Sequence, residues 1–419
     1  MKSYFFNKVS GIILLTVGLV ACSKGKNAGE PVVDPDPTPT ETITLNHPCM
    51  LHTAADFALV KTKVEANAQP WKAGYDVLTA SAYANVNYAP NAVVKLVRGG
   101  GSKEEPDPDN YGNAYRDVAA AYQLALRWKI TGDDSYAAKA VLILNTWAST
   151  CTSISGDSNK FLASGIYGYQ FANAAEILRD YSGWAPADFT KFKTWMVNLW
   201  YPLALDFLER HNGACDSHYW ANWDIANMNT VLAIGILADD KSKINYAIQY
   251  FKKGIGTGNI DHAVVYRHNV NGEDLGQCQE SGRDQGHATL VISLFGSFCQ
   301  MAYNVGVDLF AYENNKVLAM CEYVAKYNVN TAYSVPFVPY KNCDAASLTP
   351  EHTMVSTAER GTLRPSWELI YNHYRAKGVT AKYSQEFAEK VRPEGGGGNY
   401  GPNSGGFDQL GFGTLMYSK

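Results

Sequence analysis

Hydrophobic side chains recur every three to four residues along most of this chain, which is the spacing of helices that bury one face. Residues 114–130 carry an apolar stripe made of Tyr115, Val118, Ala119, Tyr122 and Leu126. A Gly-Asp turn follows, and Asp133 or Asp134 then stands where a second helix, within residues 131–149, needs a cap. The two segments therefore predict an antiparallel helical hairpin.

The same pairing of helical segments repeats along the chain. Further pairs are expected at residues 54–67 with 70–83, 165–181 with 186–210, 222–240 with 242–254, 287–306 with 309–328, and 365–378 with 380–391. In most pairs one helix is rich in Ala, Gly and Leu and its partner is more charged, as helices of an inner and an outer ring would be. We predict an all-α fold, an (α/α) toroid or barrel of six to seven antiparallel hairpins. A helical-repeat solenoid is the alternative, although no strict repeat motif is present. Strand-like alternation is confined to short pieces such as residues 262–266 and 334–340.

The first residues of the chain have the pattern of an export signal. Lys2 and Lys8 precede a short apolar segment that ends in L-V-A-C, and this ending matches a bacterial lipoprotein signal. We expect a signal peptide at residues 1–21, lipidation of Cys22, and a Pro- and Asp-rich flexible tether at residues 22–44. Residues 45–419 are then expected to form a single domain, the toroid, in the cell envelope, facing the periplasm or the outer-membrane surface. A plain secretory signal with an unmodified Cys22 is the alternative.

Composition narrows the range of partners. The net charge of -4 gives no broad basic surface for nucleic acid. Aromatic residues make up 12% of the chain, with 27 Tyr and 9 Trp, which is typical of exported proteins that handle carbohydrate. Of the 8 cysteines, removal of Cys22 leaves seven, an odd number without tight spacing, so no particular disulfide is predicted. We expect a monomer whose only membrane contact is the Cys22 anchor.

One stretch, QESGRDQGHA, places four ionisable side chains before an apolar run. Glu280, Arg283, Asp284 and His287 have the spacing of one helical face. A structural interpretation is that Ser281 caps the helix with Asp284 at its third position, while Arg283 pairs with Glu280 or Asp284. That interpretation leaves His287 unexplained. An arginine held by carboxylates beside a histidine is also a preorganised anion-binding site.

A second stretch, CDSHYWANWD, combines a histidine, an amide and aromatic rings at the start of an apolar helix. His218 and Asn222 are four residues apart, with Tyr219, Trp220 and Trp223 beside them. The structural interpretation is that Asn222 caps the helix and His218 lies on the surface. The functional interpretation is that both line the same cleft as Arg283.

Motifs for metals and nucleotides are missing from the sequence. There is no H-E-x-x-H, paired C-x-x-C, G-x-S-x-G, Walker loop or dinucleotide fingerprint, and GGGGNYGPNSGG lacks the Lys-Ser/Thr of a phosphate loop. We therefore expect neither a metal nor a cofactor. Asn, His, Tyr and Arg at an aromatic cleft fit β-elimination of a polyuronate. In that reaction the sugar carboxylate is neutralised, the C5 proton is removed and the leaving O4 is protonated.

The order of these motifs resembles the alginate-lyase-domain polysaccharide lyases, most of all polysaccharide lyase family thirty-eight. The resemblance runs from about Leu51 to Tyr417 and includes NWDIANMNTVLAIGIL, ESGRDQGHATL and GGFDQLGFGTLMY. It implies an (α/α) toroid that cleaves alginate, or a related polyuronate such as glucuronan, endolytically and without a cofactor. The family's Asn-Trp motif falls on Asn222 and Trp223. Related toroid families carry an adjacent Asn-His pair, whereas here His218 precedes Asn222 by four residues.

The resemblance and the residues together give the following assignment. Asn222 and Arg283, with His218, neutralise the uronate carboxylate, and Glu280 and Asp284 hold Arg283 and His287 in place. His287 or a tyrosine exchanges the protons at C5 and O4. The tyrosine is Tyr219 as first choice, or else Tyr303, Tyr167 or Tyr169. Sugar stacking is assigned to Trp223, Tyr169 and Tyr115.

Two other functions remain open at this point. One is an (α/α)-barrel glycoside hydrolase that uses two of Asp224, Glu280 and Asp284 as its carboxylates. The other is a non-catalytic glycan-capture lipoprotein. The lyase alone makes an unsaturated uronate that absorbs ultraviolet light.

Overall fold

The computed structural model of the chain describes residues 41–344, 351–398 and 407–419. The expected signal peptide, Cys22 and most of the tether lie outside the described residues. The folded unit begins at Glu41, four residues before the expected boundary at residue 45. The reason is that the last tether residues bind the domain: the Thr44 amide donates to the Val305 carbonyl at 2.9 Å, and Lys241 Nζ donates to the Ile43 carbonyl at 2.9 Å.

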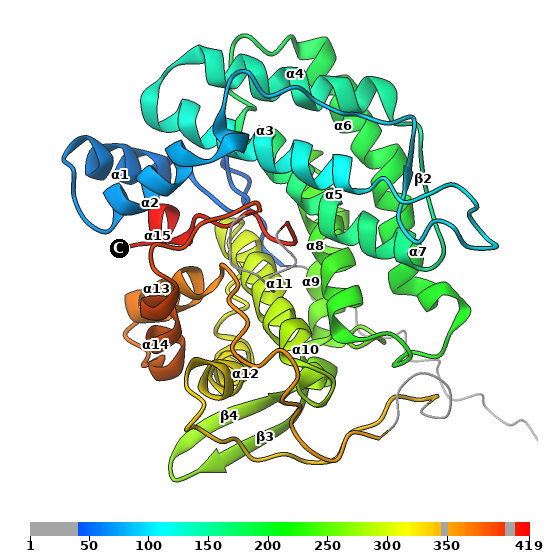
Figure 1. Ribbon diagram of the computed structural model, residues 1–419, viewed down its shortest axis with the longest axis vertical. Helices are drawn as coiled ribbons and strands as arrows, with labels where there is room; N and C mark the ends of the chain where they lie inside the picture. The colour runs from blue at the N-terminus through cyan, green and yellow to red at the C-terminus, as the bar shows by residue number, and fades with distance from the viewer. Residues whose placement is uncertain (1–40, 345–350, 399–406) are drawn as a thin grey trace, which may run out of the picture. The chain divides into compact units, whose positions relative to one another are not determined.

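The described residues are mainly helical, as the apolar spacing predicts (Figure 1). The helices are α1 (Ala54–Glu65), α2 (Trp71–Ala80), α3 (Gly112–Thr131), α4 (Asp134–Thr150), α5 (Asn159–Ile177), α6 (Pro186–Trp195), α7 (Tyr201–Arg210), α8 (Ala221–Leu237), α9 (Lys241–Lys253), α10 (Ile260–Ala263), α11 (Gln285–Asn304), α12 (Tyr312–Val329), α13 (Trp367–Ala376), α14 (Lys382–Val391) and α15 (Gly413–Met416). Six packed pairs account for most of them: α1 with α2, α3 with α4, α5 with α7, α8 with α9, α11 with α12, and α13 with α14. The predicted (α/α) toroid is confirmed.

The inner helices are buried on every side, as their Ala- and Gly-rich sequences indicate. In α8 every residue except Trp223 is buried, and in α11 every residue from Gln285 to Ala302 except His287. Helices α5 and α8 run in the same direction, because Gly165 faces Ala226 and Gly168, one turn later, faces Thr230. The Asn229 amide donates to the Leu294 carbonyl at 2.9 Å, which sets α11 beside α8.

Two small sheets accompany the helices. Strands β1 (Lys95–Val97) and β2 (Ser153–Ser155) pair in parallel, and β3 (Val264–Val270) and β4 (Glu273–Cys278) form an antiparallel hairpin that packs on α12 (Figure 1). The hairpin is longer than the alternation at residues 262–266 predicts. Its turn is Asn271-Gly272, and both residues have a positive φ, of 54° and 83°. Asn-Gly is the pair that such two-residue turns favour. Residues 334–340 are not a strand apart from a single bridge between Tyr340 and His352.

The segment expected as one helix at residues 186–210 is interrupted. A π-helical turn, Met196–Trp200, separates α6 from α7. Pro202 lies in the first turn of α7, and proline has no amide hydrogen to continue the ladder of an α-helix. The described residues also form three short 3-10 turns, at Ala82–Ala84, His211–Gly213 and Gln279–Gly282. Among the described residues, no helix has the length and apolar character that a membrane span needs.

Candidate active site

The N-terminus of α8 is capped by side chains from another part of the chain. Trp220, the residue before the helix, supplies no side-chain cap. Instead the amide of Ala221 donates to Gln279 Oε1 at 3.0 Å, and the amide of Asn222 donates to Glu280 Oε1 at 2.8 Å. Asn222 therefore does not cap the helix. Its side chain is buried, and the Oδ1 atom has no hydrogen-bond partner among the described residues, so the amide group is not committed to the fold.

Glu280 connects α8 to a chain of charged groups that leads into α11. Its Oε2 atom accepts from Arg283 Nη1 at 3.1 Å, and Arg283 Nη2 lies 3.2 Å from His287 Nε2. On the far side of the ring, His287 Nδ1 lies 2.7 Å from Asp284 Oδ2. Arginine can only donate, so Nε2 of His287 carries the lone pair and its proton is on Nδ1, which donates to Asp284. The predicted grouping of Glu280, Arg283, Asp284 and His287 is present.

The helix begins later than the sequence suggests. Glu280 and Ser281 lie in the 3-10 turn Gln279–Gly282, and Asp284 is the N-cap of α11, accepting from the His287 amide at 2.7 Å. Ser281 is therefore not the cap, and its hydroxyl is buried without a partner among the described residues. Burial alone would raise the pKa of the Asp284 carboxyl, but its bonds to His287 and the charge of Arg283 outweigh burial and lower that pKa.

The three carboxylates that a hydrolase would use are all committed to other groups. Asp224 is fully buried, with Oδ1 3.0 Å from His211 Nε2 and Oδ2 accepting from the Tyr250 hydroxyl at 3.2 Å. Glu280 is fully buried between Asn222 and Arg283. A general acid needs a raised pKa, whereas the pKa of Asp284 is lowered. The geometry therefore does not supply the carboxylate pair of a glycosidase.

Trp220, which the CDSHYWANWD stretch includes without a role, and His352, which no motif singled out, lie beside Arg283. The Arg283 guanidinium carbon is 5.2 Å from the centroid of the Trp220 ring, and the His352 ring is 5.4 Å from the same ring. His352 is brought there by its backbone pairing with Tyr340 and by close contact with Gly282. Burial and the charge of Arg283 lower the pKa of His352, so this ring is neutral. Because its position depends on pairing across loops, local spacing could not identify it.

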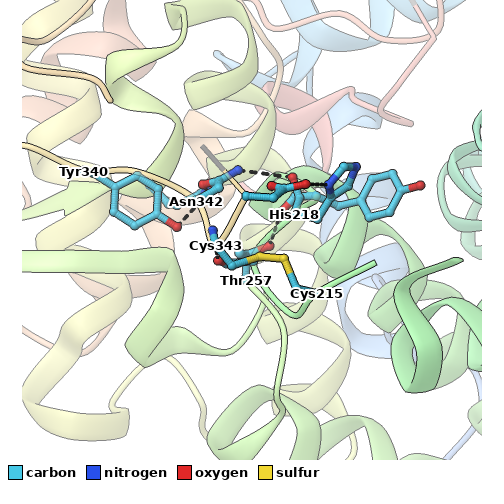
Figure 2. The surroundings of a disulfide bond; sticks show 10 residues. Cys215, His218, Thr257, Tyr340, Asn342 and Cys343 are labelled. Carbon is cyan, nitrogen blue, oxygen red and sulfur yellow. Dashed lines mark hydrogen bonds and ion pairs between the residues drawn. A yellow bond between two sulfur atoms is a disulfide. The ribbon is translucent and has the colours of Figure 1, made fainter. Parts of the chain in front are cut away.

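A disulfide that the sequence did not predict lies next to His218 (Figure 2). Cys215 and Cys343 are bonded across 128 residues and fix the loop before α8 to the loop that carries Tyr340. His218 pairs with a residue far along the chain. Its Nδ1 atom forms an ion pair with Asp344 beside the disulfide, because the loop turns its ring in that direction (Figure 2).

Tyr219 and Trp223 form an aromatic cluster behind the site. Their ring centroids are 4.8 Å apart, and both rings pack on Phe207. The Tyr219 hydroxyl accepts from the Asn212 amide at 3.1 Å. The first choice for the proton-transferring tyrosine thus packs its ring against Phe207 and pairs its hydroxyl with Asn212. Trp223, the one residue of α8 that is not buried, is half covered by the same cluster.

The other tyrosines chosen from the sequence are placed differently. Tyr303 is wrong as a site residue: it lies in the last turn of α11, 16 residues beyond His287 and thus about 24 Å along the helix. Tyr169 is fully buried and donates to the Asp408 carbonyl at 3.0 Å, so it cannot stack on a sugar. Tyr115 is partly exposed and stacks on Phe407 at 4.3 Å.

A second basic and aromatic group lies at the start of α3 and in the first half of α5. Arg98 Nη1 donates to the Tyr167 hydroxyl at 3.1 Å, and its guanidinium carbon is 4.9 Å from the Tyr111 ring. Tyr115 also contacts Tyr167, at 6.1 Å between ring centroids. Since α5 and α8 are parallel neighbours, this group and Asn222 lie at the same end of the inner ring. We call Arg98, Tyr111, Tyr115 and Tyr167 the Arg98 group.

Comparisons with known structures agree on the fold. An alginate lyase from Bacteroides ovatus aligns over 89% of this chain and 100% of its own with a TM-score of 0.59 and 13% identity. Alginate lyase A1-III from Sphingomonas species A1 aligns over the same shares, 89% and 100%, with a TM-score of 0.54 and 14% identity. A variant of A1-III complexed with tetrasaccharide gives a TM-score of 0.51 at 13% identity, over 89% of this chain and 98% of that one.

The family comparison rests on the sequence. A comparison with the curated proteins finds none that matches this chain. The alginate lyase family model matches residues 61–332, which is more than half of the chain and includes α8, the 3-10 turn before α11, and α11 itself. The chain therefore belongs to the alginate lyase family and is a polysaccharide lyase.

Proposed function

We propose that this lyase cleaves alginate, or a related polyuronate such as glucuronan, inside the polymer by β-elimination, and that within its family it is nearest to polysaccharide lyase family thirty-eight. The observation that carries the proposal is Arg283, held between the buried Glu280 and His287 and joined to Asn222 through the same glutamate. Arg283 supplies a cation and the Asn222 side chain supplies an uncommitted amide, the two kinds of group that neutralisation of a uronate carboxylate requires. The matched family and the alginate lyases of the same fold support the substrate class.

The charge of the site favours an anionic sugar. Helices α8 and α11 both begin here, and helix N-termini carry partial positive charge. Arg283 adds a full charge, and 28% of its side chain remains exposed to meet a ligand. Asn222 then donates to the second carboxylate oxygen. Neutralising that carboxylate makes the C5 proton acidic and stabilises the enolate-like intermediate.

His287 is assigned as the group that takes the C5 proton. Asp284 fixes the proton of His287 on Nδ1, so the lone pair of Nε2 points toward Arg283. When the uronate carboxylate draws the N–H of Arg283 away, Nε2 is released to accept the proton. Binding of the anion and exposure of the base are thereby coupled. The imidazolium that forms gives the proton to the departing O4, a role we move from Tyr219 to His287.

Internal cleavage is supported by the Arg98 group. Arg98 supplies a second cation, and Tyr111 and Tyr115 supply partly exposed rings, at the same end of the inner ring as Arg283. Two cationic positions can hold two uronates of one chain, which favours binding along a polymer over binding at its end.

The test is a panel of polymannuronate, polyguluronate, glucuronan and a neutral polysaccharide, followed by ultraviolet absorbance and by viscosity. We expect ultraviolet absorbance to rise with at least one polyuronate and to stay unchanged with the neutral polysaccharide. The viscosity of the polyuronate solution should fall early in the reaction, as cleavage inside the polymer requires. His287→Ala should abolish the signal, and Tyr303→Phe, at the other end of α11, should keep it. Shortening of a polyuronate without absorbance, or full activity of His287→Ala, would overturn the proposal.

We also propose that Cys22 is lipidated and holds the enzyme at the cell envelope, as the sequence before it indicates. Cys22 lies outside the described residues, so the support is the L-V-A-C pattern and the Pro- and Asp-rich segment after it. In cells given labelled palmitate, the full chain should be labelled and sediment with membranes, and Cys22→Ala should be unlabelled. Labelling of the variant, or an unlabelled full chain, would contradict the anchor.

A further inference from the structure

Three side chains with different metal-binding chemistry meet at the end of α5 that lies away from Arg283. His47 Nδ1 is 2.5 Å from Glu176 Oε1, Cys49 Sγ is 3.5 Å from His47 Nδ1, and Cys49 Sγ is 3.9 Å from Glu176 Oε1. Cys49 and Glu176 are buried, and 18% of the His47 side chain is exposed. No step of the proposed reaction uses these residues.

We propose that His47, Cys49 and Glu176 bind a zinc ion. Imidazole, thiolate and carboxylate are the three ligand types that zinc takes in proteins, and tetrahedral bonds of zinc to them place the ligand atoms about 3.4 to 3.6 Å apart. The two separations that involve Cys49 Sγ already lie near this value. The contact between His47 and Glu176 is the hydrogen bond that the ion replaces, and it opens when the proton leaves. The exposed edge of His47 leaves the fourth position to water.

The surrounding residues hold the ligands as the outer groups of a zinc site do. His47 Nε2 lies 2.7 Å from Asp239 Oδ1, so a carboxylate orients the ring from behind, which is the usual arrangement for a metal-bound histidine. Arg179 Nε donates to Glu176 Oε2 at 3.0 Å, and Arg179 Nη1 donates to Asp239 Oδ2 at 3.3 Å. Glu176 Oε1 is thus the oxygen left to face Cys49 and His47.

The charges balance with a divalent ion. Zinc with a Cys49 thiolate, a Glu176 carboxylate and a neutral His47 is electrically neutral, and Arg179 cancels Asp239. In the metal-free protein, hydrogen bonds with Cys49 and Glu176 occupy His47 Nδ1, which is the ring nitrogen that would bind the ion.

The position of the cluster gives the ion a structural role. Glu176 is the last residue but one of α5, a 19-residue helix about 28 Å long whose other end faces the active site. His47 and Cys49 belong to the first segment of the folded unit. Zinc would fasten this segment to the inner ring. The proposed zinc site replaces the expectation of no metal. The sequence did not indicate the site because Glu176 lies 127 residues from Cys49 and no spacing motif connects them.

The first test is direct metal binding by the full chain. The protein is incubated with excess zinc chloride, passed through a desalting column and analysed for metal. We expect one zinc per chain, also in the controls Cys151→Ala, another buried free cysteine, and His287→Ala. Cys49→Ala should lose the ion. Less than about one tenth of a zinc per wild-type chain, or full retention by Cys49→Ala, would overturn the proposal.

The second test needs no variant and so does not depend on whether Cys49→Ala folds. Cobalt(II) is added to the metal-free wild type, and absorbance is recorded. We expect a thiolate-to-cobalt charge-transfer band with the intense visible bands of tetrahedral cobalt, both lost when zinc is added. A spectrum without the charge-transfer band would refute the site, whatever the lyase activity proves to be.

Discussion

Replacing Glu280 by glutamine tests whether one buried carboxylate organises the active site. Glu280 accepts from the Asn222 amide at 2.8 Å and from Arg283 Nη1 at 3.1 Å. Both partners donate. In Glu280→Gln the new NH₂ group must face one of these donors, so one hydrogen bond is replaced by a repulsive contact. Arg283 also loses the negative charge that fixes its position.

The size of the effect follows from the burial of the two partners. A hydrogen bond to a charged group contributes about 1.5–3 kcal/mol, and Glu280 is fully buried. Because 28% of the Arg283 side chain is exposed, water can replace part of the hydrogen bonding that Arg283 loses in the variant. We expect the free energy of unfolding to fall by about 1–3 kcal/mol. Removing one well-placed donor to a developing anion costs about 100- to 1000-fold in rate, and we expect a loss of this size in kcat/KM.

Urea unfolding and ultraviolet lyase assays on the same samples separate the two effects, and the chain offers a matched control. Glu322 is also buried and also caps a helix, accepting from the amides of Tyr383 at 2.9 Å and Ser384 at 2.8 Å. Glu322→Gln should lose comparable stability and keep its kcat/KM. In a double-mutant cycle, Glu280→Gln should cost much less when Arg283→Ala is already present. Wild-type kcat/KM in Glu280→Gln, or equal activity losses in both glutamine variants, would refute this role of Glu280.

Three further results are expected. Replacing Cys215 and Cys343 together by serine should lower the free energy of unfolding by about 3–5 kcal/mol, because the bond closes a long loop, and urea titration should show the same loss in reduced wild type. Burial works against protonation of His211, but the hydrogen bond and charge of Asp224 outweigh burial and raise the pKa of His211 above 6.5. The stability that the His211–Asp224 pair contributes is therefore present below pH 6.5 and is lost as the pH rises through the raised pKa. The stability advantage of wild type over His211→Gln should therefore shrink above pH 6.5, and an advantage that grows would contradict the pairing. Arg98→Ala should raise KM for a polyuronate several-fold with little change in kcat; a loss confined to kcat would place Arg98 in the chemical step instead.

The fold was largely predictable because the apolar spacing and the caps of a helical hairpin lie within short stretches of sequence. The stripe on α3 and the cap of α4 at Asp133 are both visible within one or two helical turns of sequence. The β3–β4 hairpin was underestimated because its alternation is interrupted by polar and glycine residues. The Asn271-Gly272 turn was the stronger signal. The π-helical turn before Pro202 follows from the missing amide hydrogen of proline and could also have been expected.

The site was predictable only where its contacts are local. The contacts of Arg283 with Glu280 and His287 span three and four residues, so helical spacing indicates them. The hydrogen bond between Glu280 and the Asn222 backbone amide joins residues that are 58 positions apart, so helical spacing cannot indicate it. The same holds for His352, which reaches the site through backbone pairing between loops. Nor could spacing indicate the ion pair of His218 with Asp344, which lies 126 residues further along the chain.

The central claim is that Arg283 and His287 serve β-elimination. The measurement that tests it most directly is the mass of the oligosaccharides released from whichever polyuronate is cleaved. Elimination consumes no water, so every new non-reducing end should be lighter by one water molecule than a hydrolytic product. We expect only such unsaturated products from the wild type and none from His287→Ala. Saturated products, with a water added at each cut, would contradict the mechanism.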